Sequence, residues 1–184
     1  MPESNRAGFE FRGINHLALV CRNMARTVEF YQDILGMPLI KTLNLPDGKG
    51  QHFFFDAGND TSIAFFWFPE APEAQPGVVQ ASRGGGVSAH GSMNHLAIDV
   101  APEHLELYRQ RLVDAGIEVT PIVNHDDSPR TISPEVNATT FVRSIYFHDP
   151  DGIRLELAAW ARPFTPEDAA APAVDVDHRE AETA

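Results

Sequence analysis

The sequence predicts an α+β protein in which two tandem βαβββ modules form one cupped mixed sheet. Three observations lead to this prediction. The motif Asn-His-Leu-Ala occurs twice, at 15–18 and 94–97; a helix and a strand follow each copy; and each half ends in two strands joined by a tight turn. Such a self-repeat indicates one structural unit used twice. Each module has one helix to cover its sheet, so the bare faces form a concave surface that suits a ligand.

Each module is expected to contain a helix directly after its first strand. In 23–36, apolar residues recur at helical spacing after an asparagine that can cap the helix, and a glycine can end it. In 101–116, the same spacing follows a proline suited to a first helical turn, and a glycine again closes the helix. Each helix leads into an expected strand, at 36–43 and at 116–123.

The ends of the two halves align without a gap. Residues 53–68 lie over 145–160, and both stretches indicate strand, tight turn and strand, with Gly-Asn-Asp in one turn and Asp-Pro-Asp-Gly in the other. The offset between the halves is larger here than at the Asn-His motifs. The extra residues therefore fall in 124–139, a polar, proline-containing insert found in the second half only.

Composition sets the domain boundaries and excludes several function classes. The formal net charge of -12, without a basic patch, argues against binding to nucleic acid or to an anionic membrane. Cys21 is the only cysteine, which excludes an internal disulfide and a zinc-thiolate cluster. The absence of a signal-like or membrane-spanning stretch leads us to expect a cytoplasmic protein. The expected division is an extension (1–10), a first module (11–68), a Pro/Gly-rich linker (69–91), a second module (92–161) and a disordered acidic tail (162–184).

The candidate metal ligands are His16, His95 and Glu156. The two histidines open the first strand of each half, so the pseudo-symmetry can direct both into one cup. Glu156 alternates with leucines in its strand and faces away from them, where an ionised carboxylate is costly without a positive partner. Two imidazoles and one carboxylate form the facial set that holds Fe(II) or Mn(II) and leaves coordination positions open.

Plainer interpretations of these residues stay open at this point. A single histidine at a strand start is more often a hydrogen-bonded polar group than a ligand. Glu156 could equally pair with Arg154 or Arg143 at a sheet edge. The duplication favours ligation, because packing alone does not explain two matching histidines.

The segments "NHLALV", "NHLAID" and "YFHDPDGIRLEL", in a tandem βαβββ layout, resemble the vicinal oxygen chelate superfamily. That superfamily includes glyoxalase I, fosfomycin- and bleomycin-resistance proteins and type I extradiol dioxygenases. The resemblance covers about residues 11 to 161. It implies that His16, His95 and Glu156 are the metal ligands and that the protein is cup-shaped, and pairing as a homodimer is common in this superfamily.

The number of ligands separates the branches of this superfamily. Glyoxalase I-like enzymes usually carry a fourth ligand, a glutamate, on the last strand of the first half, where this chain has Ala64. Three ligands resemble the extradiol pattern and imply an Fe(II)-dependent oxidoreductase that binds a vicinal diol and O2, with Mn(II) or another first-row metal as alternatives. Tyr146 matches a tyrosine that hydrogen-bonds the substrate oxygen in extradiol enzymes, or is a core aromatic like Phe54. Arg143 could help to neutralise that oxygen.

One position departs from the extradiol pattern. The acid/base histidine expected nine residues before Tyr146 is replaced by Asn137, which can hydrogen-bond but cannot supply a proton. The substitutes are His125, His148 and His90, and no motif selects one of them. Alternation in the last strand of the first half places Ala64, Phe66 and Phe68 on the face equivalent to that of Glu156; with Phe54 and His148 they would line an aromatic-tolerant cup.

Two other functions remain as alternatives to a dioxygenase. One is metal-dependent proton transfer of the glyoxalase or epimerase kind, which needs a base that Ala64 does not provide. The other is a non-catalytic protein that binds a drug or metabolite, against which retention of the metal triad weighs. In each case the expected partner is a small molecule, with O2 in the first case only.

Overall fold

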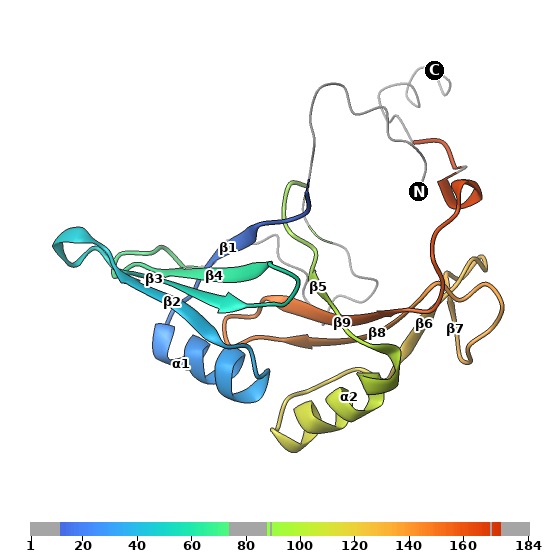
Figure 1. Ribbon diagram of the computed structural model, residues 1–184, viewed down its shortest axis with the longest axis horizontal. Helices are drawn as coiled ribbons and strands as arrows, with labels where there is room; N and C mark the ends of the chain where they lie inside the picture. Colours follow the sequence, from blue (N-terminus) through green and yellow to red (C-terminus); the bar gives the residue numbers. More distant parts are fainter. Residues whose placement is uncertain (1–11, 74–87, 89, 170, 174–184) are drawn as a thin grey trace.

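The computed structural model describes residues 12–73, 88, 90–169 and 171–173 and confirms the predicted α+β fold (Figure 1). The strands form two separate sheets, one in each module, where one continuous sheet was expected. The first module contains a four-stranded sheet in the order β1-β4-β3-β2, in which β1 and β4 are parallel and the other pairs are antiparallel. Its elements are β1 (His16–Val20), α1 (Met24–Val28), a π-helical continuation (Glu29–Ile34), β2 (Leu39–Asn44), a 3-10 turn (Pro46–Gly48), β3 (Gln51–Asp56) and β4 (Ser62–Trp67).

The second module repeats this topology with one additional strand. Its five-stranded sheet has the order β5-β9-β8-β6-β7, and β5 and β9 are again parallel. Its elements are β5 (Leu96–Asp99), a 3-10 turn (Pro102–His104), α2 (Leu105–Asp114), β6 (Val123–His125), β7 (Ile132–Ser133), β8 (Val142–His148) and β9 (Arg154–Trp160), followed by a 3-10 turn (Pro166–Ala169).

The gap-free alignment of the two halves is confirmed by the strand registers. Phe54 of β3 pairs with Ala64 of β4, and Tyr146 of β8 pairs with Glu156 of β9. On the parallel side, Ala18 pairs with Ala64, and Ala97 pairs with Glu156. Ala64 and Glu156 therefore occupy equivalent places in the two sheets.

The predicted helix ends are also confirmed. The Asn23 side chain accepts hydrogen bonds from the backbone N–H groups of Ala25 and Arg26, which caps α1. Gly36 and Gly116 follow the helices with φ of 74° and 78°, the left-handed conformation that glycine adopts without strain.

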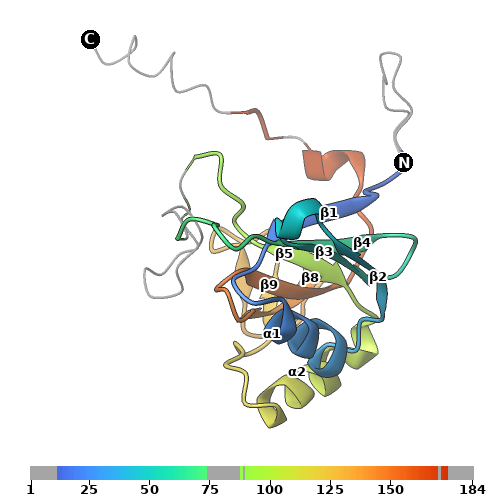
Figure 2. The same cartoon turned by 90° about the vertical axis from the view of Figure 1, so that its left-hand side faces the viewer.

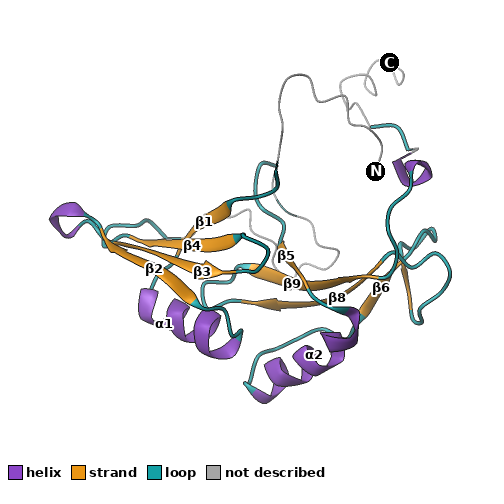
Figure 3. Ribbon diagram, in the orientation of Figure 1, coloured by secondary structure: helices purple, strands orange, loops and turns teal. Residues whose placement is uncertain are grey.

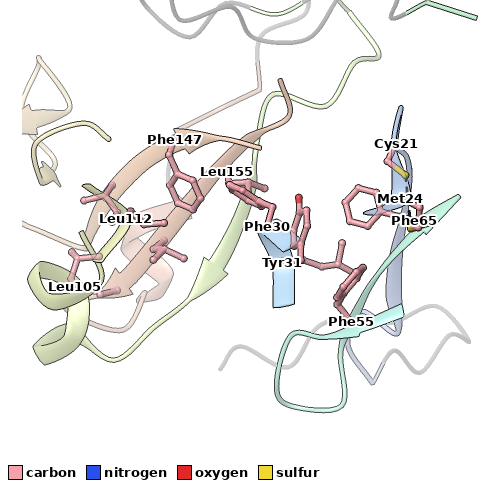
Figure 4. Close-up of a cluster of buried hydrophobic side chains, with 14 residues drawn as sticks. Cys21, Met24, Phe30, Tyr31, Phe55, Phe65, Leu105, Leu112, Phe147 and Leu155 are labelled. Carbon is pink, nitrogen blue, oxygen red and sulfur yellow. Dashed lines mark hydrogen bonds between the residues drawn. The ribbon is translucent and has the colours of Figure 1, made fainter. Parts of the chain in front are cut away.

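Both helices lie on the same side of the two sheets, which leaves the opposite, open faces uncovered by helix (Figures 2 and 3). The buried side chains of both modules form one cluster between helices and sheets (Figure 4). Phe30 and Tyr31 are neighbours in the π-helical segment and point to different modules: the Phe30 ring lies 6.4 Å from Phe147, and the Tyr31 ring lies 4.8 Å from Phe65. The Tyr31 hydroxyl also donates to the buried carboxylate of Asp149.

The structure differs from the expected elements in three places. The strand expected at 116–123 is confined to β6, since Ile117–Ile122 lack a strand ladder and β6 pairs with β8 only from Val123. The insert 124–139 contributes β7 and part of β6 to the sheet. In the tail, Arg162 binds Asp127 and Asp168, so residues 162–169 have defined contacts where disorder was expected.

The N-terminal extension, most of the linker and the end of the tail lie outside the described residues. Among the helices that the structure describes, none combines the length and apolar character needed to cross a membrane.

Candidate metal centre

The open face of the second module gathers polar side chains around Glu156. Alternation places Glu156, Tyr146 and Ser144 on this face, while the leucines and aromatic residues between them point to the helices. His95 directly precedes β5 and reaches the same point: its Nε2 lies 2.8 Å from Glu156 Oε2. The Ser144 hydroxyl donates to the other oxygen of the carboxylate. Glu156 is only 5% exposed, so the neighbouring groups must offset the cost of its burial.

The repeated Asn-His pair has a structural explanation. Asn94 Oδ1 lies 2.6 Å from His95 Nδ1, and Asn15 Oδ1 lies 2.7 Å from His16 Nδ1. An amide oxygen can only accept, so each Nδ1 carries a proton, and Nε2 is the ring nitrogen that can bind a metal ion. A hydrogen bond of this kind is the usual way in which proteins orient a metal-binding histidine.

The contact between His95 and Glu156 requires a positive charge. A neutral His95 with its proton on Nδ1 has a lone pair at Nε2, and the carboxylate oxygen 2.8 Å away is also an acceptor. The two repel each other unless a proton or a metal ion lies between them. Two ligands about 2.1 Å from one ion and at right angles to each other lie about 3 Å apart, so the spacing suits a shared cation.

Within one chain, His16 is not joined to the other two predicted ligands. Among the residues that the structure describes, no three histidine, cysteine or carboxylate side chains lie close enough to hold a metal ion. His16 is exposed at the start of β1, and its ring contacts Phe54 at a centroid distance of 5.7 Å. One chain therefore brings together two of the three predicted ligands, His95 and Glu156.

Tyr146 lies on the polar face beside both assembled ligands. Its ring packs edge-on against His95 at 5.7 Å, and its hydroxyl lies 3.1 Å from His125 Nε2. Burial, followed by the negative charge of Glu156, raises the pKa of Tyr146 to about 12. The phenol is therefore neutral near neutral pH and offers a hydrogen-bonding hydroxyl.

The structure places Arg143 and Asn137 away from this cluster. Arg143 alternates to the opposite face of β8 and donates to Asn124. Asn137 donates to Asp126 and accepts from Thr139, so its amide holds the insert together. The cation nearest to Tyr146 is instead Arg154, which lies 4.3 Å above the phenol ring.

Of the three histidines considered as substitutes for the acid/base, only His125 contacts Tyr146 in the described structure. His148 is on the same face of β8 and lies opposite Arg154; burial and that positive charge lower its pKa. His90 is exposed in the segment before the second motif.

The open face of the first module is aromatic. Phe54, Phe66 and Phe68 lie on it as predicted, and Ala64 is fully buried between them. No sequence pattern indicated a role for His52, which stacks on Phe66 at 3.6 Å. Its Nε2 is the one buried side-chain polar atom without a hydrogen-bond partner among the described residues. Burial and the neighbouring His16 lower its pKa.

Known proteins resemble the chain over most of its length. A lactoylglutathione lyase from Salmonella typhimurium is 28% identical over 147 residues, covering 77% of this chain and 88% of the relative. The metallothiol transferase FosB of Shouchella clausii is 27% identical, covering 79% and 78%. A glyoxalase family protein from Enterococcus faecalis superposes with a TM-score of 0.57 at 26% identity, covering 80% of this chain and 98% of that structure.

The family itself is established by a match to its sequence profile. This match spans residues 13–157, which begins just before the first Asn-His motif and ends one residue after Glu156. The chain therefore belongs to the Glyoxalase/Bleomycin resistance protein/Dioxygenase superfamily.

Proposed function

We propose that the protein is a metal-dependent enzyme that binds a small substrate through two neighbouring oxygen atoms, with His16, His95 and Glu156 as the metal ligands. The observation that carries the proposal is the contact of His95 Nε2 with the buried Glu156 carboxylate, at 2.8 Å, with the Nδ1 proton of His95 fixed by Asn94. The superfamily relatives include a metallothiol transferase, in agreement with a metal centre.

The third ligand comes from a second copy of the chain. Asn15 orients His16 as Asn94 orients His95, yet His16 lies exposed on an edge strand of its own sheet. β5 is the corresponding edge strand of the second sheet, and its open-face residues Ala97 and Asp99 are exposed too. A symmetric dimer that places the first module of one chain against the second module of its partner forms two equivalent sites.

Different residues of the chain have different roles at such a site. A divalent ion bound there acts as a Lewis acid that stabilises negative charge on a substrate oxygen. Tyr146 hydrogen-bonds that oxygen, and the Arg154 guanidinium above its ring contributes positive charge. Phe54, Phe66 and Phe68 exclude water from the opposite wall.

For the reaction, we favour extradiol-type oxygenation with Fe(II), or with Mn(II). Ala64 stands where the pseudo-symmetry would place a fourth protein ligand, and its methyl group cannot coordinate. Three protein ligands on one face leave positions for a diol and for O2.

Proton transfer at a metal-bound substrate, as in an isomerase or lyase, is the second candidate. Two observations favour it: the relatives include lactoylglutathione lyases, and His52 presents a buried Nε2 that has no hydrogen-bond partner on the open face. An imidazole with a lowered pKa is a suitable base near neutral pH.

Metal analysis after loading with Fe(II) or Mn(II) tests the shared centre. Wild-type protein should hold one ion per chain, and His16→Ala or Glu156→Gln should lose it. A mixture of these two inactive variants should regain about one quarter of the wild-type sites, because half of the dimers are mixed and each contains one intact site. No recovery on mixing would place all three ligands in one chain, and metal retention by both variants would refute the centre.

Oxygen uptake separates the two reactions. An oxygen electrode with a panel of vicinal diols should record stoichiometric O2 consumption if the enzyme is a dioxygenase. Turnover of hemithioacetals or epimerisable 2-oxo acid derivatives without O2 consumption would establish proton transfer instead.

A further inference from the structure

The His125–Tyr146 pair connects the insert of the second module to the candidate metal centre. His125 ends β6 and pairs with Val142, which lies on the same face of β8 as Tyr146. Its Nε2 lies 3.1 Å from the Tyr146 hydroxyl, and the two rings are nearly perpendicular at 86°.

We propose that His125 is the positioning residue that fixes the Tyr146 hydroxyl for an oxygen atom of the bound substrate. This inference rests on the proposed function, because it assumes a ligand on the face of His95 and Glu156. His125 does not touch that ligand and acts through Tyr146.

The geometry explains why the hydroxyl needs such support. A phenol oxygen can rotate its proton freely around the C–O bond, and the carboxylate of Glu156 is on the paired residue of the next strand. Without a second partner, the hydroxyl would turn toward that negative charge and away from the substrate. The hydrogen bond to His125 gives the hydroxyl a partner on β6, which lies on the other side of β8 from the strand of Glu156.

The surroundings hold His125 in place in turn. Phe141 lies 6.3 Å from its ring, and the Phe141 backbone N–H donates to the His125 carbonyl. Phe164 from the C-terminal segment packs on Phe141 at 5.7 Å, so the tail supports this side of the site. His125 is therefore held by the backbone hydrogen bond with Phe141 and by the packing of the Phe141 and Phe164 rings.

The ligand class that fits this arrangement is a small diol or enediol with one ionised oxygen. The contact of His125 Nε2 with the Tyr146 hydroxyl stabilises a ligand oxygen by hydrogen bonding, while Arg154 above the phenol ring and the metal supply the charge.

Binding of 4-nitrocatechol to the Mn(II)-loaded protein without oxygen tests the pair, since the absorption of this probe changes when its hydroxyls ionise. Tyr146→Phe and His125→Ala should each weaken binding about tenfold, as expected for one hydrogen bond, and shift the bound spectrum in the same direction. The double variant should be no weaker than either single variant, because both remove one interaction. His125→Gln, whose amide reaches the Nε2 position, should restore most of the affinity.

A matched control exists on the other side of the molecule. His104 and Tyr108 also form a histidine–tyrosine contact, at 3.4 Å, but on the exposed surface of the second helix region. His104→Ala should bind the probe like the wild type. Additive losses in the double variant, wild-type affinity in His125→Ala, or no binding of the probe by wild-type protein would each overturn the inference.

Two further readouts separate this inference from the proposed function. Metal content is measured before each titration. If Glu156→Gln keeps its metal, the proposed function fails. If His125→Ala has full metal content and unchanged probe binding, only the positioning role is contradicted. In metal-free protein, the imidazole 15N resonances of His125 should shift on Tyr146→Phe and not on Tyr108→Phe. Unshifted resonances overturn the pair itself.

Discussion

The open faces of the two modules are built on the same strand registers but carry opposite chemistry. In the second module, Glu156 is surrounded by Ser144, His95 and Tyr146. In the first, Ala64 takes the place of Glu156 and Phe54 that of Tyr146. The comparison teaches that duplication kept the scaffold and divided the roles: one half supplies charge and hydrogen bonds, and the other supplies an apolar wall and His16, the proposed third ligand.

The largest expected effect comes from the residue that most distinguishes the two faces. Among the described residues, Glu156 supplies the carboxylate that lies at hydrogen-bonding distance from His95. We expect Glu156→Gln to lower metal affinity by more than about 100-fold, which exceeds the effect of losing a group that only orients a ligand. Isothermal titration with Mn(II) measures this loss. Glu103→Gln, the same change at an exposed carboxylate before α2, is the control and should leave the affinity unchanged.

The two asparagines test whether the halves are equivalent where the sequence repeats. Asn15→Ala and Asn94→Ala each remove the hydrogen-bond acceptor of the Nδ1–H group of the following histidine. We expect each change to reduce metal affinity by about 10- to 100-fold. The same titration gives both values. A loss confined to Asn94→Ala would mean that His16 is no ligand and that the repeat is only a scaffold feature.

The smallest expected effect lies at the junction between the modules. Asp149 is 6% exposed, and burial raises its pKa to about 6, although it accepts from Tyr31 and from the backbone. Because the pKa of Asp149 is higher in the folded than in the unfolded chain, this side chain stabilises the folded protein fully below about pH 4. The stabilisation is lost as the pH rises through about 6. Between pH 5 and 8 the Asp149 contribution should fall by about 1–2 kcal/mol.

Chemical denaturation at several pH values checks this dependence. Asp149→Asn should remove that part of the pH slope and should be more stable than the wild type at pH 8. Asp60→Asn, in the turn that is equivalent in the first module and exposed, provides the control. An unchanged slope in Asp149→Asn would show that the carboxylate is ionised throughout this range.

Much of the fold could be predicted because it follows from local patterns. The self-repeat, the helix caps and the alternation in β8 and β9 each depend on residues close in the chain, and the registers of Phe54 and Tyr146 agree with the alignment. The contribution of the insert to the sheet could not be predicted. Its pairing of Asn124 with Arg143 depends on residues far apart in sequence, and a polar segment such as 124–139 lacks the apolar alternation that indicates a strand.

The candidate site was predictable in composition and less so in arrangement. His95, Glu156 and Tyr146 converge as pseudo-symmetry and alternation suggest. Arg143 and Asn137 were predicted from their spacing along the chain, without regard to which face of the strand each side chain occupies. Alternation directs Arg143 away from Tyr146. Hydrogen bonds within the insert occupy Asn137. Arg154 and His125 contact Tyr146 from neighbouring strands, which only the sheet order reveals.

The amide behind each histidine also fixes the electrostatic balance of a centre held by His16, His95 and Glu156. In many metal sites a carboxylate holds the outer nitrogen of the imidazole and makes that ligand more basic. Asn15 and Asn94 are uncharged, so the two rings stay weaker electron donors. A divalent ion with one carboxylate then keeps one net positive charge, which a ligand bearing a single negative charge cancels. If the proposed metal centre exists, we therefore expect the doubled asparagine to favour monoanions over neutral or doubly ionised molecules.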